Sequence, residues 1–184
     1  MISHSTEHSA NRIHHLSALR FPFLSVILLL LLLVPVPGKA DDPCALTPVD
    51  AARVHEMVTQ SGAKLTLVNY WSTWCVPCRE EMPALSQLQR KYARDGLRVI
   101  FVSMDFESNK VSALDTLLAK GGRLPSYIKG QKDDPFISGI HSEWSGAIPA
   151  TFLYDAEGTL LTWWNEAQTF SEFEQDILPY LKNK

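Results

Sequence analysis

Two cysteines separated by two positions, Cys75 and Cys78, are the residues whose chemistry stands out. They follow an apolar run, Leu65–Tyr70, and open a segment with helical periodicity. A thiol attacks a disulfide only as the thiolate, and the free amides and the dipole at a helix N-terminus stabilise that anion. In Cys-X-X-Cys motifs the thiol pKa falls from about 8.5 to between roughly 3.5 and 7.5. The pair therefore predicts a dithiol that opens and closes as a disulfide.

The two cysteines are expected to have different roles. Cys75 stands at the helix entry and is the expected nucleophile, whereas Cys78, one turn further in, would resolve the mixed disulfide. Pro77 suits the first helical turn and is expected to stiffen the pair and to contact substrate. Trp74 is expected to pack against the dithiol and to contribute to substrate binding.

Other uses of the pair fit the sequence less well. A zinc site needs about four ligands, and residues 41–184 add only Cys44, His55 and His141, in no recognisable spacing. A purely structural bridge across so short a loop removes little chain entropy. The alternative function is a copper-binding or metallochaperone module in which both thiolates act as soft ligands. The absence of a well-placed third ligand from the sequence argues against that alternative. No metal site is therefore predicted.

The elements that position the pair belong to an α/β fold. Residues 65–70 and 97–104 are dense in apolar and β-branched side chains, which is typical of strands covered on both faces in a parallel sheet. Residues 77–93 carry one apolar stripe, so strand, helix and strand form a βαβ unit. Residues 151–154 and 159–164 read as a hairpin around a polar turn. The prediction is a central mixed sheet flanked by helices.

Further elements are predicted from caps and periodicity. A helix before Leu65 would begin with Thr47 as its cap and Pro48 at its first position. The last helix would open with a capping box formed by Ser171 and Glu174. The remaining predictions are helices over 108–120 and 135–144 and a short strand over 124–128.

Two stretches of the chain resemble a known family. Trp71-Ser72-Thr73-Trp74-Cys75-Val76-Pro77-Cys78-Arg79-Glu80-Glu81-Met82-Pro83 resembles the active-site segment of the thioredoxin superfamily, specifically its TlpA/ResA-like extracytoplasmic thiol-disulfide oxidoreductases. Ala147-Ile148-Pro149-Ala150-Thr151-Phe152-Leu153 resembles the family's second signature, a cis-proline loop that leads into a strand. The resemblance covers most of the chain from about Thr47. It implies a thioredoxin-like fold, no cofactor, protein thiols and disulfides as substrates, and a membrane or periplasmic redox partner.

The resemblance also implies roles for three further residues. The Ile148–Pro149 bond would be cis and beside the dithiol, and the backbone of Ile148 would pair with an extended substrate segment. Glu81 matches a glutamate of the TlpA/ResA-like branch, while Asn69 stands where thioredoxin has a buried aspartate. A partly buried Glu81 near Cys78 would take up or return a proton and make exchange depend on pH. The alternative for Glu81 is an ordinary solvated helix charge.

The motif does not determine the direction of electron flow. The branch includes reducing members, for example in cytochrome c maturation, while other relatives oxidise substrates. A reductant is the expectation here. A helix before Leu65 would depart from many branch members, which have an extra strand hairpin there. A thioredoxin-fold interaction domain without turnover is a further alternative.

The first 40 residues differ in character from the rest. A polar start is followed by the leucine-rich run Phe21–Val36 and then by Pro37-Gly38-Lys39-Ala40, which is the order of a secretory signal peptide. An uncleaved membrane anchor is the alternative, although the run is short for the roughly 20 residues that span a bilayer. Residues 41–184 would then be one thioredoxin-like domain in the periplasm or another extracytoplasmic compartment. Cys44 has no partner there once Cys75 and Cys78 are paired.

Composition and charge exclude other classes. With 46% hydrophobic and 20% charged residues the chain has ordinary globular composition. Residues 1–40 contain Arg12, Arg20 and Lys39 but only one acidic residue, Glu7, which gives them a net charge of +2. The whole chain has a net charge of −3, so residues 41–184 have a net charge of −3 − 2 = −5. A mildly acidic domain lacks the basic patch that nucleic-acid binding needs.

Overall fold

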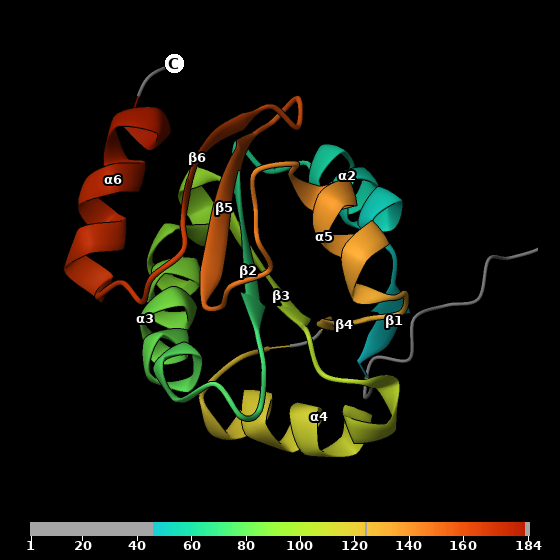
Figure 1. The fold of residues 1–184 in the computed structure, drawn as a ribbon. Helices are drawn as coiled ribbons and strands as arrows, with labels where there is room; N and C mark the ends of the chain where they lie inside the picture. Colours follow the sequence, from blue (N-terminus) through green and yellow to red (C-terminus); the bar gives the residue numbers. More distant parts are fainter. Residues whose placement is uncertain (1–45, 124, 183–184) are drawn as a thin grey trace, which may run out of the picture. The chain divides into compact units, whose positions relative to one another are not determined.

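The computed structural model describes residues 46–123 and 125–182. These residues form one six-stranded mixed sheet with helices on both faces (Figure 1). The predicted leader and Cys44 lie outside the described residues. Within the described ranges, no helix combines the length and the hydropathy needed to cross a membrane.

The sheet combines the predicted βαβ unit with the predicted hairpin. Its spatial order is β1-β4-β3-β2-β5-β6. The first four strands are parallel to one another, while β5 is antiparallel to β2 and β6 is antiparallel to β5. All seven residues of β2 are buried, which explains the apolar run. The strands are β1 (Thr47–Val49), β2 (Leu65–Trp71), β3 (Leu97–Ser103), β4 (Tyr127–Lys129), β5 (Ala150–Asp155) and β6 (Leu160–Trp164).

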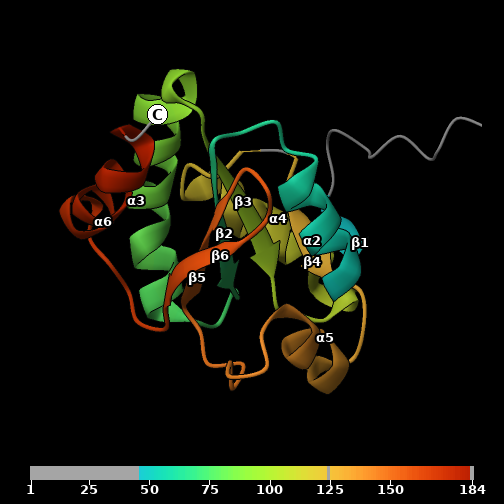
Figure 2. The same cartoon turned by 90° about the horizontal axis from the view of Figure 1, so that it is seen from above.

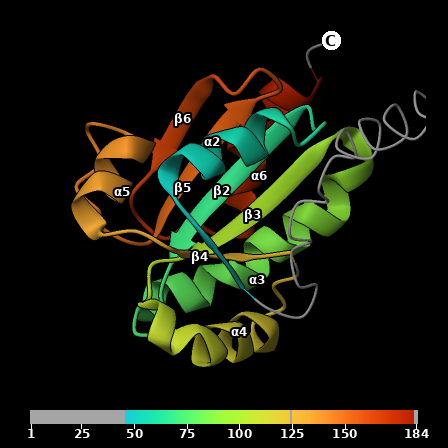
Figure 3. The ribbon, with the colours of Figure 1, turned by 90° about the vertical axis from the view of Figure 1, so that its right-hand side faces the viewer.

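The helices make two layers with the sheet between them. Helices α2 (Ala51–Thr59) and α5 (Asp133–Ile140) cover one face, and α3 (Val76–Tyr92) and α6 (Phe170–Lys182) cover the other (Figures 2 and 3). Helix α4 (Lys110–Ala119) buries Ala113 and Leu117 in the same cluster as α3 and α6. Because side chains alternate along a strand, Leu67 and Val68 of β2 enter opposite cores.

The predicted start of the first helix is wrong, because a short strand occupies the first residues assigned to it. Thr47, Pro48 and Val49 form β1, which pairs with β4, and the helix cap is Asp50, whose side chain accepts the Arg53 N–H at 2.7 Å. A proline lacks the N–H of a strand residue, so it is tolerated on an outer strand such as β1. Pairing with β4 therefore places these three residues in a strand, although the local sequence pattern assigns them to the start of the helix.

The predicted capping box of the last helix is also displaced. Thr169 and Glu172 cap each other, with the Thr169 N–H donating to the Glu172 carboxylate at 2.7 Å and the Glu172 N–H to Thr169 Oγ1 at 3.3 Å. Glu174 instead accepts hydrogen bonds from Lys91 Nζ and Tyr92 Oη of α3, both at 2.6 Å. Two overlapping sequence patterns fit a capping box, and contact with α3 decides between them.

Other boundaries shift by a few residues. Residues 107–109 form a 3-10 turn before α4, β4 begins at Tyr127, and α5 ends before Trp144. The hairpin tryptophans are both half-buried: Trp163 stacks on Phe152 in one core, and Trp164 packs against Phe173 in the other.

Candidate active site

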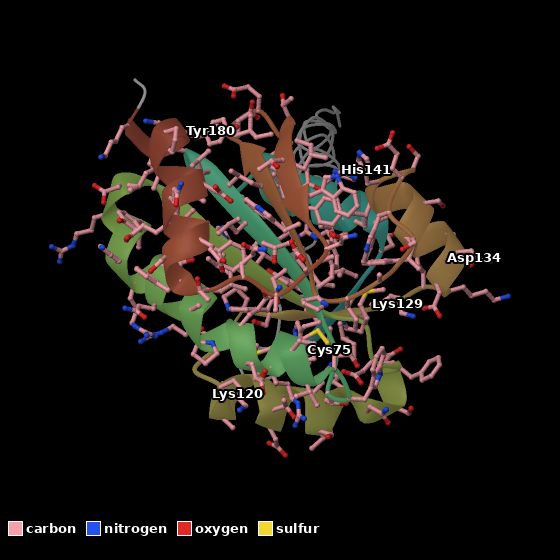
Figure 4. The ribbon with its side chains drawn as sticks, turned by 60° about the vertical axis from the view of Figure 1, so that its left-hand side comes forward. Cys75, Lys120, Lys129, Asp134, His141 and Tyr180 are labelled. Carbon is pink, nitrogen blue, oxygen red and sulfur yellow. A yellow bond between two sulfur atoms is a disulfide. The ribbon has the colours of Figure 1, made fainter. Side chains whose placement is uncertain are left out.

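The dithiol lies between the central strand and the longest helix. Strand β2 ends at Trp71 and α3 begins at Val76, so four residues carry the chain from one to the other. Cys75 is the N-cap of α3, and its Sγ accepts the Cys78 N–H at 3.3 Å. The two cysteines form a disulfide with a Cα–Cα distance of 5.3 Å (Figure 4). Their placement at the helix N-terminus is the one that the motif predicts.

The two sulfurs are unequally accessible. Cys75 is 5% exposed and Cys78 is fully buried. The neighbouring Pro77 lies in the first helical turn and is exposed. An incoming thiol or disulfide would therefore reach Cys75 before Cys78.

Glu81 is buried one turn after Cys78. It is only 3% exposed, and residues three apart on a helix lie on one face, about 5–6 Å apart at Cβ. Its carboxylate accepts hydrogen bonds from Asn69 Nδ2 at 2.8 Å and from the Gln168 N–H at 3.0 Å. Glu81 is therefore no solvated helix charge.

Burial gives Glu81 a titration near neutral pH. Loss of hydration disfavours the charged form and raises the pKa of Glu81 from 4.5 to about 7, although the hydrogen bonds from Gln168 and Asn69 act in the opposite direction. A carboxyl group with such a pKa both donates and accepts a proton at neutral pH. It lies on the same helix face as the buried thiol.

Asn69 connects this carboxylate to the next strand. Its Nδ2 also donates to Thr151 Oγ1 of β5 at 2.9 Å, so the amide bridges α3 and β5. The sequence singles out Asn69 and Glu81 but neither Thr151 nor Gln168. Gln168 acts through its backbone N–H, which no side-chain pattern could have signalled.

The proline loop reaches the same end of the sheet. The Ile148–Pro149 peptide bond is cis. Ala150 pairs with Tyr70 in the β2–β5 register, so buried Pro149 stands one position beyond that pair, towards Cys75. Ile148 is half-buried and packs against both cores. The two predicted signatures therefore meet at the carboxyl end of β2.

Large apolar side chains are exposed around this end. Trp74 is 69% exposed and Val76 51%, and they flank Cys75 on either side. Trp74 thus lies mostly in solvent, whereas Trp71 belongs to the core. Phe106, 71% exposed, follows the carboxyl end of β3. The carboxyl ends of the parallel strands are where ligands bind in open α/β sheets.

Metal ligands do not gather at the dithiol in the described part of the chain. No group of three or more His, Cys, Asp or Glu side chains within residues 46–123 and 125–182 could hold an ion. His55 Nε2 lies 3.0 Å from the Gly139 oxygen, and the His141 ring packs against Phe152 and Trp163. Both histidines are therefore engaged elsewhere.

Comparison with known proteins agrees with this geometry. The chain is 31% identical over 125 residues to the thiol-disulfide oxidoreductase ResA of Bacillus thuringiensis, covering 67% of this chain and 66% of the relative. It is 33% identical over 119 residues to the thioredoxin-like protein YneN of Bacillus subtilis, covering 62% and 64%. The chain thus spans just under two thirds of the length of these curated relatives.

A solved structure shares the fold. The crystal structure of a thiol:disulfide interchange protein, a thioredoxin family protein from Chlorobium tepidum, has a TM-score of 0.55 at 20% identity, over 78% of this chain and 99% of that one. The fold is therefore thioredoxin-like. The model of the AhpC/TSA family matches residues 46–162, which include both signatures. This chain belongs to the AhpC/TSA family.

Proposed function

We propose that this protein is a thiol-disulfide oxidoreductase that exchanges disulfides with protein substrates through Cys75 and Cys78. The observation that carries the proposal is the disulfide at the N-terminus of α3, one helical turn from a buried carboxyl group. Relatives named thiol-disulfide oxidoreductases support it.

In the reducing direction the exchange has two steps. The Cys75 thiolate attacks a substrate disulfide, forms a mixed disulfide and releases one substrate sulfur as a thiolate. The Cys78 thiolate then attacks Cys75 Sγ and releases the second substrate sulfur. The substrate gains two electrons and, after protonation, two hydrogens, while the protein is left with the Cys75–Cys78 disulfide seen in the structure.

Glu81 is the proposed proton carrier for the second step. Cys78 is buried and must lose its proton before it can attack. Glu81, with a pKa of about 7, would accept that proton and return it when the disulfide is reduced again.

The surroundings of Cys75 suit a polypeptide substrate. Exposed Trp74, Val76 and Pro77 would contact its side chains, and the backbone of Ile148, next to Pro149, would pair with it as an added strand. Exposed apolar groups around a reactive site are typical of protein-binding surfaces.

The proposed compartment is extracytoplasmic. The secretory character of residues 1–40 supports export, with the leader either removed or kept as an anchor. A reductant in that compartment needs its own electron supply, so a periplasmic or membrane redox partner completes the proposal. The metallochaperone alternative has no support from a third ligand among the described residues.

Insulin reduction tests the activity. We expect turnover in the wild type, loss of turnover in Cys75→Ser, and unchanged turnover in Cys44→Ser, which removes the remaining cysteine. Equal activity in the wild type and Cys75→Ser would exclude the proposed chemistry. Equilibration with a glutathione couple gives the direction, since a reductant has a lower potential than that couple.

A further inference from the structure

A single buried carboxylate ties the segment before Cys75 to the end of β3. Asp105 is 2% exposed and follows β3 by two residues. Its Oδ1 accepts hydrogen bonds from Ser72 Oγ at 3.1 Å and Thr73 Oγ1 at 2.7 Å. Its Oδ2 accepts from the Thr73 N–H at 2.9 Å and from Ser103 Oγ at 2.7 Å. Three of these four donors belong to Ser72 and Thr73.

These hydrogen bonds act on the turn that places Cys75. The Ser72 oxygen accepts the Cys75 N–H at 3.2 Å, which closes the turn directly before α3. The Met104 N–H donates to the Trp71 oxygen at 2.7 Å, which joins the two strand ends next to this contact. Hydrogen bonds to a carboxylate are stronger than those between neutral groups. Asp105 therefore restrains half of the four-residue connection between β2 and α3.

Charged groups of β4 and α5 also lie near the carboxylate. Lys129 of β4 has a side chain that is 4% exposed and is paired with Asp133 of α5. Burial lowers the pKa of Lys129, while the Asp105 charge acts in the opposite direction. The donors that Asp105 directly contacts are nevertheless those of Ser72, Thr73 and Ser103.

The restraint matters most when the disulfide is open. In the oxidised protein the bond to Cys78 holds Cys75 beside the helix. After reduction that bond is gone, and stabilisation of a thiolate by a helix end falls off within the first turn. An ordered turn then helps to keep the Cys75 sulfur close to the free amides, together with the Arg79 N–H that donates to the Cys75 oxygen at 3.2 Å.

We propose that Asp105 is a positioning residue for Cys75, holding the Ser72–Thr73 turn so that the Cys75 thiolate stays at the N-terminus of α3. This role rests on the proposed thiol-disulfide exchange. It explains why a carboxylate is buried against uncharged donors at this point in the fold.

Thr73→Val tests the role without changing the charge. The substitution keeps the shape of the side chain and the backbone N–H but removes the donor Oγ1. We expect the pKa of Cys75 in the reduced protein to rise by about half a unit, which lowers the fraction of thiolate below that pKa about threefold and the exchange rate by a smaller factor, since a thiolate of higher pKa is more nucleophilic. The pKa is read from the ultraviolet absorbance of the thiolate. Thr73→Ser, which retains the hydroxyl, should restore wild-type values.

Ser103→Ala is the matched control. It removes a hydrogen bond of the same length to the Asp105 carboxylate, but from β3 instead of the turn, together with the acceptor of the Asp105 N–H at 3.1 Å. We expect reduced thermal stability with the pKa of Cys75 unchanged. The proposal is overturned if Thr73→Val leaves that pKa at the wild-type value, or if both variants shift it equally. Absence of exchange in the wild type would instead contradict the proposed function.

Discussion

Glu81 and Asn69 show how one pair of side chains couples burial to proton chemistry. The Asn69 amide donates both to Glu81 and to Thr151, which holds an uncharged donor beside the carboxylate. Because a neutral donor compensates only part of the lost hydration, the pKa of Glu81 stays raised. Position on the helix face and solvent exclusion together place a carboxyl group with a raised pKa one turn from Cys78.

Glu81→Gln should change how stability depends on pH. The pKa of Glu81 is 4.5 in the unfolded chain and about 7 in the folded protein, so the folded protein binds this proton more tightly. The resulting contribution to the free energy of unfolding is fully present below pH 4.5 and is lost as the pH rises to 7. We expect wild-type unfolding free energy to fall by up to about 3 kcal/mol more than that of Glu81→Gln over this range. Urea titrations at several pH values measure the difference.

The same variant should flatten the pH dependence of exchange around neutrality. Glu80→Gln, an exposed neighbour on the same helix, is the control and should behave like the wild type in both measurements. If Glu81→Gln also retains the wild-type pH profile, Glu81 does not exchange protons with Cys78.

At the scale of elements, the start of β2 depends on a close contact with the turn before β3. The Gly96 oxygen accepts both the Lys64 and the Leu65 N–H, at 2.8 and 3.1 Å. Gly96 has φ of 94°, and a Cβ there would stand 2.8 Å from Lys64 Cβ. The glycine therefore allows the strand that leads to Cys75 to begin beside its neighbour.

Gly96→Ala should destabilise the protein more than Gly62→Ala. Both glycines have positive φ, but nothing lies within 4 Å of a Cβ built on Gly62. We expect about 1 kcal/mol lost at Gly62, from backbone conformation alone, and about 2–4 kcal/mol at Gly96, where steric overlap adds to it. Thermal or urea unfolding of the two variants gives the comparison. Equal losses would mean that the Lys64 contact relaxes without cost.

At the scale of the folded unit, the two cores share the strands that separate them. Leu67 of β2 lies in one core, and Ile100 of β3 lies in the other. Because every central strand contributes side chains to both, neither core can be lost while the other keeps its sheet. The described residues should therefore unfold in one cooperative transition.

Truncation in either core should lower that single transition. We expect Leu67→Ala and Ile100→Ala each to cost about 2–5 kcal/mol, with far-UV circular dichroism and tryptophan fluorescence still coincident in urea. Leu118→Ala, at a residue 49% exposed, should cost far less. Separate transitions for the two signals in either core variant would contradict the shared-core argument.

Local sequence was sufficient for the elements whose patterns are strong. The apolar runs of β2 and β3, the stripe of α3 and the hairpin turn all follow from side-chain periodicity, which the chain carries within each segment. Cys75 and Cys78 could be singled out from their own spacing, whereas Glu81 and Pro149 could be singled out only through the family resemblance of the segments that contain them.

The sequence by itself thus determined the reactive pair and the strand–helix junction that presents it. Only tertiary structure decided that Thr47–Val49 is a strand, that Glu172 and not Glu174 caps α6, and that Trp74 lies in solvent. Two hydrogen-bonded contacts of the site also depend on the tertiary structure. The Gln168 N–H and Glu81 are 87 residues apart in the sequence, and Asp105 is 33 residues from Ser72 and 32 from Thr73. The physical reason is that burial and long-range hydrogen bonds depend on which segments meet, and local periodicity does not encode that.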